Sequence, residues 1–140
     1  MFKLVRRDGA RENSGHFEAL GHNGGDGYKI GQVVALENGK AVLVSGNTNT
    51  KTPYGIVARD EEATGKEVIV LRITDEMEFE VPIQGTSLID LVPGMALAIA
   101  TGSKSVIGSA TLVEGKIGAF LADPLDAKAS GDKVIVRFKA

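Results

Sequence analysis

The feature of this sequence that most limits its possible folds is a repeat, because the second half of the chain restates the first. Three segments recur in the same order. They are residues 30–36 and 93–99, residues 55–60 and 118–123, and residues 65–70 and 131–136. The first two pairs share an offset of 63 residues, and the third follows a short insertion around Pro124. Three matches in order indicate an internal duplication, with pseudo-repeats at about residues 28–73 and 91–138.

Two copies are too few for a solenoid, which needs three or more units to bury a continuous core. Each copy consists of short segments rich in Val, Ile and Leu, and the chain contains 18 glycines, a mixture that favours short strands joined by tight turns. Neither copy has enough strands to cover its own apolar face. The sequence therefore predicts an all-β fold at residues 28–140, a small internally duplicated β-barrel or sandwich with pseudo-twofold halves.

The strongest local signal is a β-hairpin. Two apolar segments, residues 32–36 and 41–44, flank a turn that contains Asn38 and Gly39. Asn-Gly supplies the two positive φ angles that a type I′ turn requires. A second signal lies at residues 76–81, where Glu alternates with apolar residues, so that one face of this strand should be wet. We expect the following Pro82 to end that strand or to place it at a sheet edge.

Residues 1–27 differ from the rest of the chain, because polar residues and glycines interrupt every apolar pair. We interpret this stretch as a flexible, extended N-terminal arm. Within it, only residues 17–20 could form a helical turn, which the glycines from Gly21 onward would end. The positive charges of the arm gather in its first dozen residues, so its tip is locally basic.

Composition excludes several classes of protein. The absence of cysteine removes disulfide scaffolds, Cys-ligated zinc, Fe–S clusters and thiol nucleophiles. A formal net charge of −2 gives no global attraction to nucleic acid. The first residues carry charges where a signal peptide needs an apolar core, and no segment approaches the ~18 apolar residues of a membrane span. We therefore expect a protein made and kept inside a cell, with neither a nucleic-acid nor a membrane partner.

Residues that could carry chemistry are few. His16 and His22 could ligate a metal together with Asp26, but nothing in the sequence fixes their mutual geometry, so we expect no metal site. The predicted β domain contains no histidine that could activate a serine. The central region is acidic, which is typical of a solvated face, and Asp60 and Asp75 are its candidate catalytic carboxylates. We expect no catalytic residue and no cofactor.

A series of β-type segments completes the pattern. They are G-x-V-V-x-L at 31–36, Y-G-I-V-A at 54–58, T-G-K-E-V-I-V at 64–70, a glutamate-rich strand running into V-P, then G-M-A-L, K-I-G-A-F and G-D-K-V-I-V-R-F. In this order they resemble the phage capsid decoration, or cement, proteins, some of which are also labelled RecA/RadA-type phage recombinases. The resemblance covers about residues 28–139.

The resemblance implies a non-enzymatic virion protein on the exterior of the assembled head, made in the bacterial host cytoplasm. Members of this family commonly sit as trimers at local threefold positions and clamp neighbouring subunits of the major capsid protein against internal DNA pressure. A flexible arm suits that function, since it can order on a neighbour by adding a strand to an exposed edge. The residues that we expect to bind the capsid in this way are Phe2, Lys3, Leu4, Val5, Arg6 and Arg7.

Two other functions stay open at this point. The first is a small β-barrel enzyme, a hydrolase or isomerase, that uses central carboxylates such as Asp60 or Asp75. The second is a DNA-binding or recombination accessory module, which the recombinase label would imply. The net charge, and the lack of a basic strand rich in aromatic residues, argue against the second.

Overall fold

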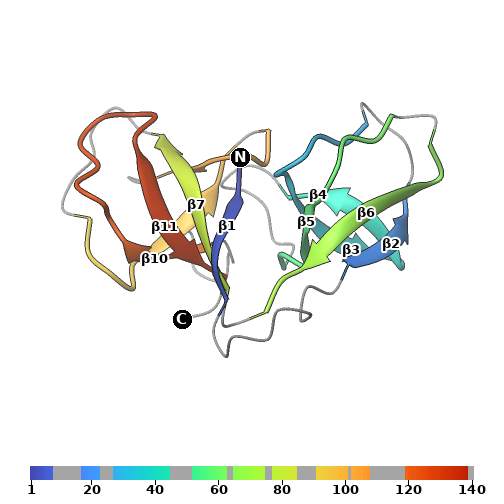
Figure 1. The fold of residues 1–140 in the computed structure, drawn as a ribbon, viewed down its shortest axis with the longest axis horizontal. Helices are drawn as coiled ribbons and strands as arrows, with labels where there is room; N and C mark the ends of the chain where they lie inside the picture. Colours follow the sequence, from blue (N-terminus) through green and yellow to red (C-terminus); the bar gives the residue numbers. More distant parts are fainter. Residues whose placement is uncertain are drawn as a thin grey trace.

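The computed structural model describes residues 1–7, 17–22, 27–44, 52–62, 65–74, 77–84, 91–100, 102–107 and 119–138. These residues form eleven strands in two sheets and no helix, which confirms the predicted all-β class for this part of the chain. The two sheets lie side by side along the long axis of the molecule (Figure 1).

The first sheet has five antiparallel strands in the order β2-β6-β5-β3-β4. Its strands are β2 (Phe17–Gly21), β3 (Val33–Glu37), β4 (Lys40–Leu43), β5 (Gly55–Val57) and β6 (Glu67–Arg72). The second sheet has six strands in the order β1-β7-β11-β10-β8-β9, and β9 also pairs in parallel with β7. Its strands are β1 (Lys3–Arg7), β7 (Met77–Gln84), β8 (Ala96–Ile99), β9 (Val106–Ile107), β10 (Ala119–Asp123) and β11 (Lys133–Arg137).

The two sheets share one order of strands. Apart from β1, the series β7-β11-β10-β8-β9 repeats β2-β6-β5-β3-β4, strand for strand. The agreement extends to a parallel contact between the first and last strand of each series. In the first sheet this contact is the bridge between His22 and Ala41, and in the second it is the pair Ile83 and Val106.

The sequence match between the halves is displaced by one residue at β10. With the offset of 63 residues, the sequence match placed Ile56 in correspondence with Ala119. In the ladders, however, Ile56 pairs with Val33 as Phe120 pairs with Ala96. Phe120 therefore takes the place of Ile56, and the shared Gly at the head of the two segments misled the alignment.

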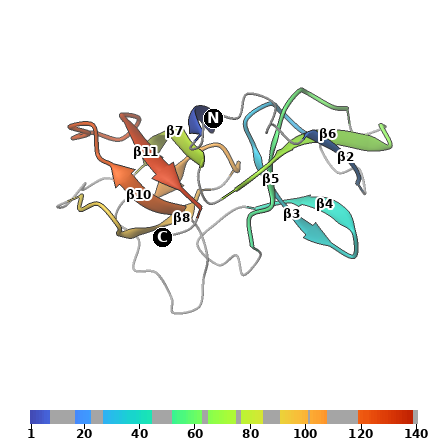
Figure 2. The ribbon, with the colours of Figure 1, turned by 60° about the horizontal axis from the view of Figure 1, so that its bottom comes forward.

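The central strands β3, β5 and β6 of the five-stranded sheet carry buried residues on both faces, which explains their continuous apolar runs. One face forms a small core around Val34, Val57, Val68 and Val70. The opposite face belongs to the main core, which it shares with the six-stranded sheet, and contributes residues such as Val33 there. The turned view again shows the two groups of strands side by side, with connecting segments between them (Figure 2).

Backbone contacts also join the two halves of the chain. The Val33 N–H donates to the carbonyl oxygen of Ser103 at 3.0 Å, and the Gln32 side-chain amide donates to that of Gly102 at 3.1 Å. Three aromatic rings fill the main core close to this junction. The Phe138 ring lies 5.4 Å from the ring of Phe2 and 5.4 Å from that of Phe79. The two sheets are therefore packed as one body.

The predicted hairpin is confirmed. Strands β3 and β4 pair from Val34 and Leu43 to Glu37 and Lys40, with the turn between them. The turn residue Asn38 has a φ of 52°, and the following Gly39 has a φ of 77°.

The apolar face of strand β7 is buried as predicted, but the opposite face is not wet at Glu78, which is buried. Pro82 does not end the strand. The strand runs through Pro82 to Gln84 and lies between β1 and β11, so it is not an edge strand. On the β11 side the Ile83 N–H donates to the carbonyl oxygen of Asp132, so the nitrogen of Pro82 faces the opposite side. There, β1 pairs with β7 only as far as Glu80 and β9 begins at Ile83. Proline is tolerated because no ladder hydrogen bond is needed at that position.

The N-terminal arm is the prediction from which the structure departs most. Within residues 1–27, β1 pairs with β7 and β2 pairs with β6, so the described parts belong to the two sheets. Phe2 is only 2% exposed and lies in the main core. The described residues 1–7 and 17–22 therefore join the two sheets where the sequence suggested an extended arm, and residues 17–20, expected to form a helical turn, belong to strand β2.

Candidate docking surface

The six residues predicted to bind a capsid do not share one environment. The ring of Phe2 is buried, and Leu4 is half-buried against the main core. Lys3 and Val5 are exposed. The remaining two residues continue β1 in its ladder with β7, Arg6 opposite Glu78 and Arg7 opposite Met77.

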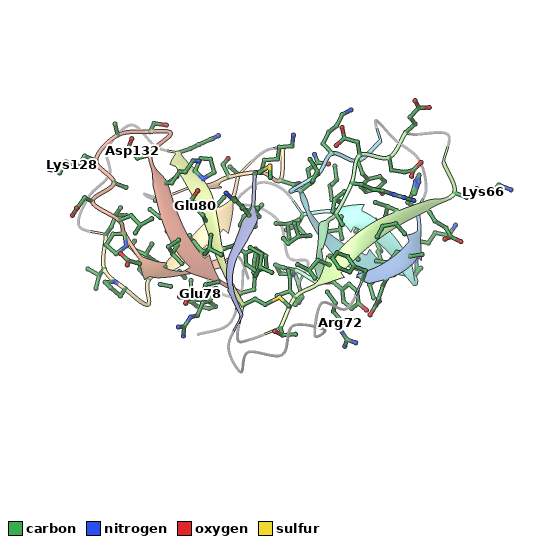
Figure 3. All side chains as sticks on the ribbon, viewed as in Figure 1. Lys66, Arg72, Glu78, Glu80, Lys128 and Asp132 are labelled. Atoms are coloured by element: carbon green, nitrogen blue, oxygen red, sulfur yellow. The ribbon has the colours of Figure 1, made fainter. Side chains whose placement is uncertain are left out.

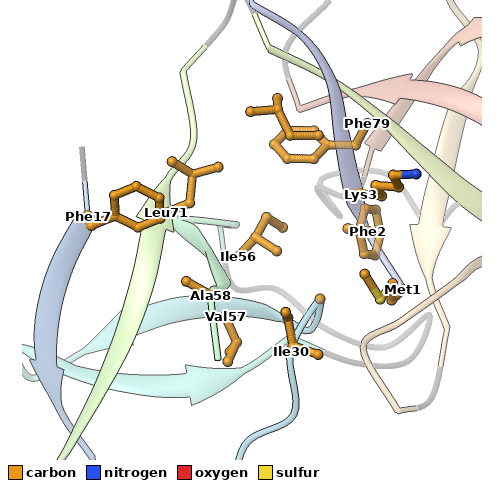
Figure 4. Close-up of a pocket in the computed structure, with 12 residues that line it drawn as sticks. Met1, Phe2, Lys3, Phe17, Ile30, Ile56, Val57, Ala58, Leu71 and Phe79 are labelled. Atoms are coloured by element: carbon orange, nitrogen blue, oxygen red, sulfur yellow. The ribbon is translucent and has the colours of Figure 1, made fainter. Parts of the chain in front are cut away.

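A hollow of about 210 Å³ lies between β1 and the five-stranded sheet (Figure 4). We call it the β1 groove and define it by six apolar residues. They are Phe2, Leu4, Phe17, Ile30, Ile56 and Leu71. Lys3 also lines it and is the only charged residue among the described lining residues. The groove therefore combines an apolar floor with one cation at its rim.

Exposed apolar side chains gather around this groove. Phe17 is 60% exposed, Met1 is 46% exposed and Ile30 is 44% exposed, and all three line it. Val5, on the neighbouring strand β1, is 46% exposed. A contiguous apolar patch of this kind on a protein surface typically marks an interaction site.

The loop that precedes β3 forms one wall of the groove, and Gly31 shapes it. Gly31 has a φ of +86°, and a Cβ atom there would lie 2.4 Å from the Cβ of Met1. Its carbonyl oxygen accepts the Phe2 N–H at 3.0 Å. Only glycine allows the N-terminal residues to approach this loop so closely, and that approach closes one end of the groove.

Asp60, one of the two candidate catalytic carboxylates, holds the same loop in place. It accepts the Ile30 N–H at 2.8 Å and lies 3.9 Å from the Lys29 ammonium group. The other candidate, Asp75, lies outside the described residues. A positioning role in the loop accounts for the contacts of Asp60.

The outer face of the six-stranded sheet carries a stripe of alternating charge. On β11, Lys133 lies 3.3 Å from Glu80 and Arg137 lies 3.5 Å from Glu78. On the other side of β7, Lys3 of β1 is the ladder partner of Glu80. Cations on β11, carboxylates on β7 and a cation on β1 therefore follow one another across three strands, with the two glutamates labelled in Figure 3.

Two further groups near the sheet ends have shifted pKa values. The Tyr54 hydroxyl donates to Glu18 Oε2 at 2.5 Å, and this hydrogen bond is the main cause that raises the pKa of Tyr54 above its ordinary value of 10.0. In the β10–β11 connection, the backbone N–H groups of Lys128 and Ala129 donate to Asp132 Oδ2 at 2.9 and 3.0 Å. These bonds lower the pKa of Asp132 below its ordinary 3.8. Both groups stabilise local structure and lie away from the lining of the groove.

The α-amino group of Met1 also departs from its ordinary titration. Burial lowers its pKa below the usual 8.0, and the positive charges of Lys104 and Lys133 lower it further. Two lysine charges therefore act on the amino group of Met1, a residue that lines the groove.

From the sequence we expected no metal site at His16, His22 and Asp26. Of these three residues, the structure describes His22. The ring of His22 is buried and packs edge-on against Tyr28 at a centroid distance of 4.8 Å. His16 and Asp26 lie outside the described residues. Among the residues that the structure does describe, no group of three or more His, Cys, Asp or Glu side chains could hold a metal ion.

Sequence reasoning singled out residues 2–7 as a binding segment but expected them in a flexible arm, and it missed the other wall of the groove. Phe17 and Ile30 were available signals, since each is a large apolar residue in a polar, glycine-rich context. What the pattern could not show is that the two residues lie beside β1 in the fold.

The comparisons with known proteins assign the chain to no family. No protein-family model matches it, and no curated protein matches it. Within the described residues, no helix is long and apolar enough to cross a membrane.

Proposed function

We propose that this protein is a non-enzymatic structural protein that binds the outside of an assembled phage capsid and stabilises it as a decoration protein. It acts there as homotrimers on the major capsid protein. The observation that carries the proposal is a two-sheet body with one shared core and an apolar patch exposed at the β1 groove. The resemblance of residues 28–139 to decoration proteins supports the choice of partner.

The shared order of strands supports a duplication within this body. We infer that each sheet descends from one ancestral unit and curls toward a small barrel, in which the parallel contact between first and last strand approaches closure. Strand β1 was then added to the second unit alone. Strand β1 covers the β7 edge of that unit and presents a new edge, which borders the groove.

A protein of this shape suits the mechanical task. Each copy offers one small apolar patch, so the affinity of a single contact is modest, and many copies on one lattice bind through their combined contacts. Because the two sheets share a core, force applied to one sheet reaches the other through packed side chains, which transmit strain.

The two alternative functions gain no support from the described residues. Asp60 holds the loop before β3 through its contacts with Ile30 and Lys29, which leaves the enzyme hypothesis without a positioned carboxylate there. The positive charges on the outer face of the six-stranded sheet alternate with Glu78 and Glu80, whereas a DNA site needs a continuous basic surface.

The test is co-sedimentation of the purified protein with mature capsids of the phage that encodes it. We expect saturable binding at a fixed ratio to the major capsid protein, and failure to bind any form of the head would overturn the proposal. Deletion of residues 1–25 is not a usable control, since it removes β1, β2 and the buried ring of Phe2. Sedimentation of the free protein measures whether trimers form before docking.

A further inference from the structure

We propose that the β1 groove receives an extended segment of a partner polypeptide, which lies along the outer edge of β1. The segment places one large apolar side chain in the groove and acidic side chains beside Lys3. This inference deepens the decoration function and rests on it for the identity of the partner, a subunit of the capsid. It differs from the arm expected from the sequence, because here β1 stays in its own sheet and the partner supplies the added strand.

The size of the groove favours a side chain over a small molecule. Its volume of about 210 Å³ is below the ~300 Å³ at which pockets for small-molecule ligands begin. The lining offers apolar contact on several sides but only one charged side chain, Lys3, together with the α-amino group of Met1. A single aromatic or branched aliphatic side chain fits this description, and such side chains are the usual anchors of protein interfaces.

The backbone of β1 favours an extended segment. Within the described residues, β1 has a strand partner on one side only, which is β7. On the groove side, the Phe2 N–H is already bonded to the Gly31 carbonyl oxygen, so the edge that can accept a strand begins after this residue. Peptides that add to an open edge gain affinity from main-chain hydrogen bonds and specificity from alternate side chains.

The charge stripe defines the chemistry of that segment. Across the outer face, the cations Lys133 and Arg137 on β11 pair with the carboxylates Glu80 and Glu78 on β7. The next strand, β1, again carries a cation, Lys3, opposite Glu80. A further strand beside β1 continues the alternation only if its outward residues are acidic, since opposite charges attract across neighbouring strands and like charges repel.

Strand β7 pairs with β1 along the edge away from the groove, and its sequence shows the alternation of residues that β1 accepts in a partner strand. Its inward residues are apolar and buried, its outward residues Glu78 and Glu80 pair with cations of β11, and Glu80 is also the ladder partner of Lys3 on β1. A partner segment with the same alternation would direct its apolar residues into the groove and its acidic residues toward Lys3.

A second copy of this chain is a poorer occupant. Strand β1 contains Lys3, Arg6 and Arg7 and no acidic residue, so a second β1 beside it would place a basic strand against a basic strand. Like charges directly opposite one another destabilise a strand pair. The basic residues of β1 therefore favour an acidic partner strand and disfavour a second copy of β1.

Binding of a short peptide tests the inference directly. The probe is a fluorescent peptide that copies residues 76–82, Glu-Met-Glu-Phe-Glu-Val-Pro, with one control peptide in which Lys replaces each Glu and another in which Ser replaces Met, Phe and Val. We expect saturable binding of the acidic peptide, measured by fluorescence anisotropy, that weakens as salt is added. We expect at least tenfold weaker binding of both control peptides. Absence of binding, or equal binding of the Lys peptide, overturns the inference.

Matched variants of the protein locate the site. Phe17→Ser and Lys3→Glu should each weaken peptide binding at least tenfold, because both side chains are exposed and border the groove. The controls are Leu125→Ser, which also replaces an exposed large apolar side chain with Ser, and Lys66→Glu, which makes the same charge reversal; both lie outside the groove lining and should leave binding within twofold. Urea denaturation of each variant checks that it is folded. Equal binding by all four folded variants would place the peptide elsewhere and refute the inference.

The same variants separate this inference from the proposed function. If the unmodified protein and Phe17→Ser bind capsids equally, the decoration function holds and the groove is not its docking site. If the peptide binds at the groove but no capsid is bound, the docking chemistry holds and the capsid is the wrong partner.

Discussion

The substitution Phe2→Ala tests whether the N-terminal residues belong to the core. The Phe2 ring is 2% exposed and contacts the ring of Phe138 at a centroid distance of 5.4 Å. Truncation of a buried Phe to Ala costs about 3–5 kcal/mol, from lost transfer energy and from the cavity that is left. For a domain of this size, we expect the melting temperature to fall by about 10 °C.

The matched control is the same substitution at Phe17. This ring is 60% exposed on strand β2, so Phe17→Ala should change the free energy of unfolding by less than about 1 kcal/mol. Equilibrium urea denaturation, followed by circular dichroism, measures both values under one set of conditions. The expected difference between the two alanine variants is about 3 kcal/mol.

One result would refute the reasoning. If Phe2→Ala and Phe17→Ala are equally stable, and both resemble the unmodified protein, then residues 1–7 contribute nothing to the core. In that case the flexible arm inferred from the sequence is the correct description. A loss confined to Phe2→Ala establishes β1 as part of the folded body.

Gly39→Ala should lower the free energy of unfolding by about 1 kcal/mol in urea denaturation, because φ is +77° and no atom lies within 4 Å of an added Cβ, which leaves backbone strain as the cost. Asp132→Asn removes a carboxylate whose pKa is lowered, so the stability it contributes is present above pH 3.8 and lost as the pH falls through the lower folded pKa. The urea midpoints of Asp132→Asn and of the unmodified protein should therefore differ above pH 3.8 and converge as the pH falls below the folded pKa. A difference between the midpoints that stays constant over this pH range would contradict the assignment of a lowered pKa to Asp132. Tyr54→Phe should cost about 1 kcal/mol, and Glu18→Gln should lower the pKa of Tyr54 toward 10.0 in a spectrophotometric titration.

Local sequence signals predicted local structure well. Asn38 and Gly39 dictate the turn between β3 and β4 through their own backbone preferences, so no distant residue is needed to form it. The alternation along β7 likewise identifies its buried face. The class of fold follows from many such short segments.

Pairing between distant residues could not be predicted in the same way. Lys3 pairs with Glu80, and Phe17 with Leu71, yet neither segment has an apolar pattern strong enough to identify a strand alone. These strands form because partners far along the chain offer them an edge. The β1 groove was missed for the same reason, since its two walls meet only when both sheets have formed.

The position of β1 has a consequence for the order in which the chain assembles. Residues 17–72 hold every strand of the five-stranded sheet, so this sheet can form as soon as that stretch has left the ribosome. Strand β1 precedes this stretch but must await β7, which follows it, and β7 in turn pairs with β11, which lies further along the chain. Long-range pairings of this kind form slowly, because a large loop must close before any contact rewards it. Among the described strands, β1 is thus made before the five-stranded sheet and paired after it.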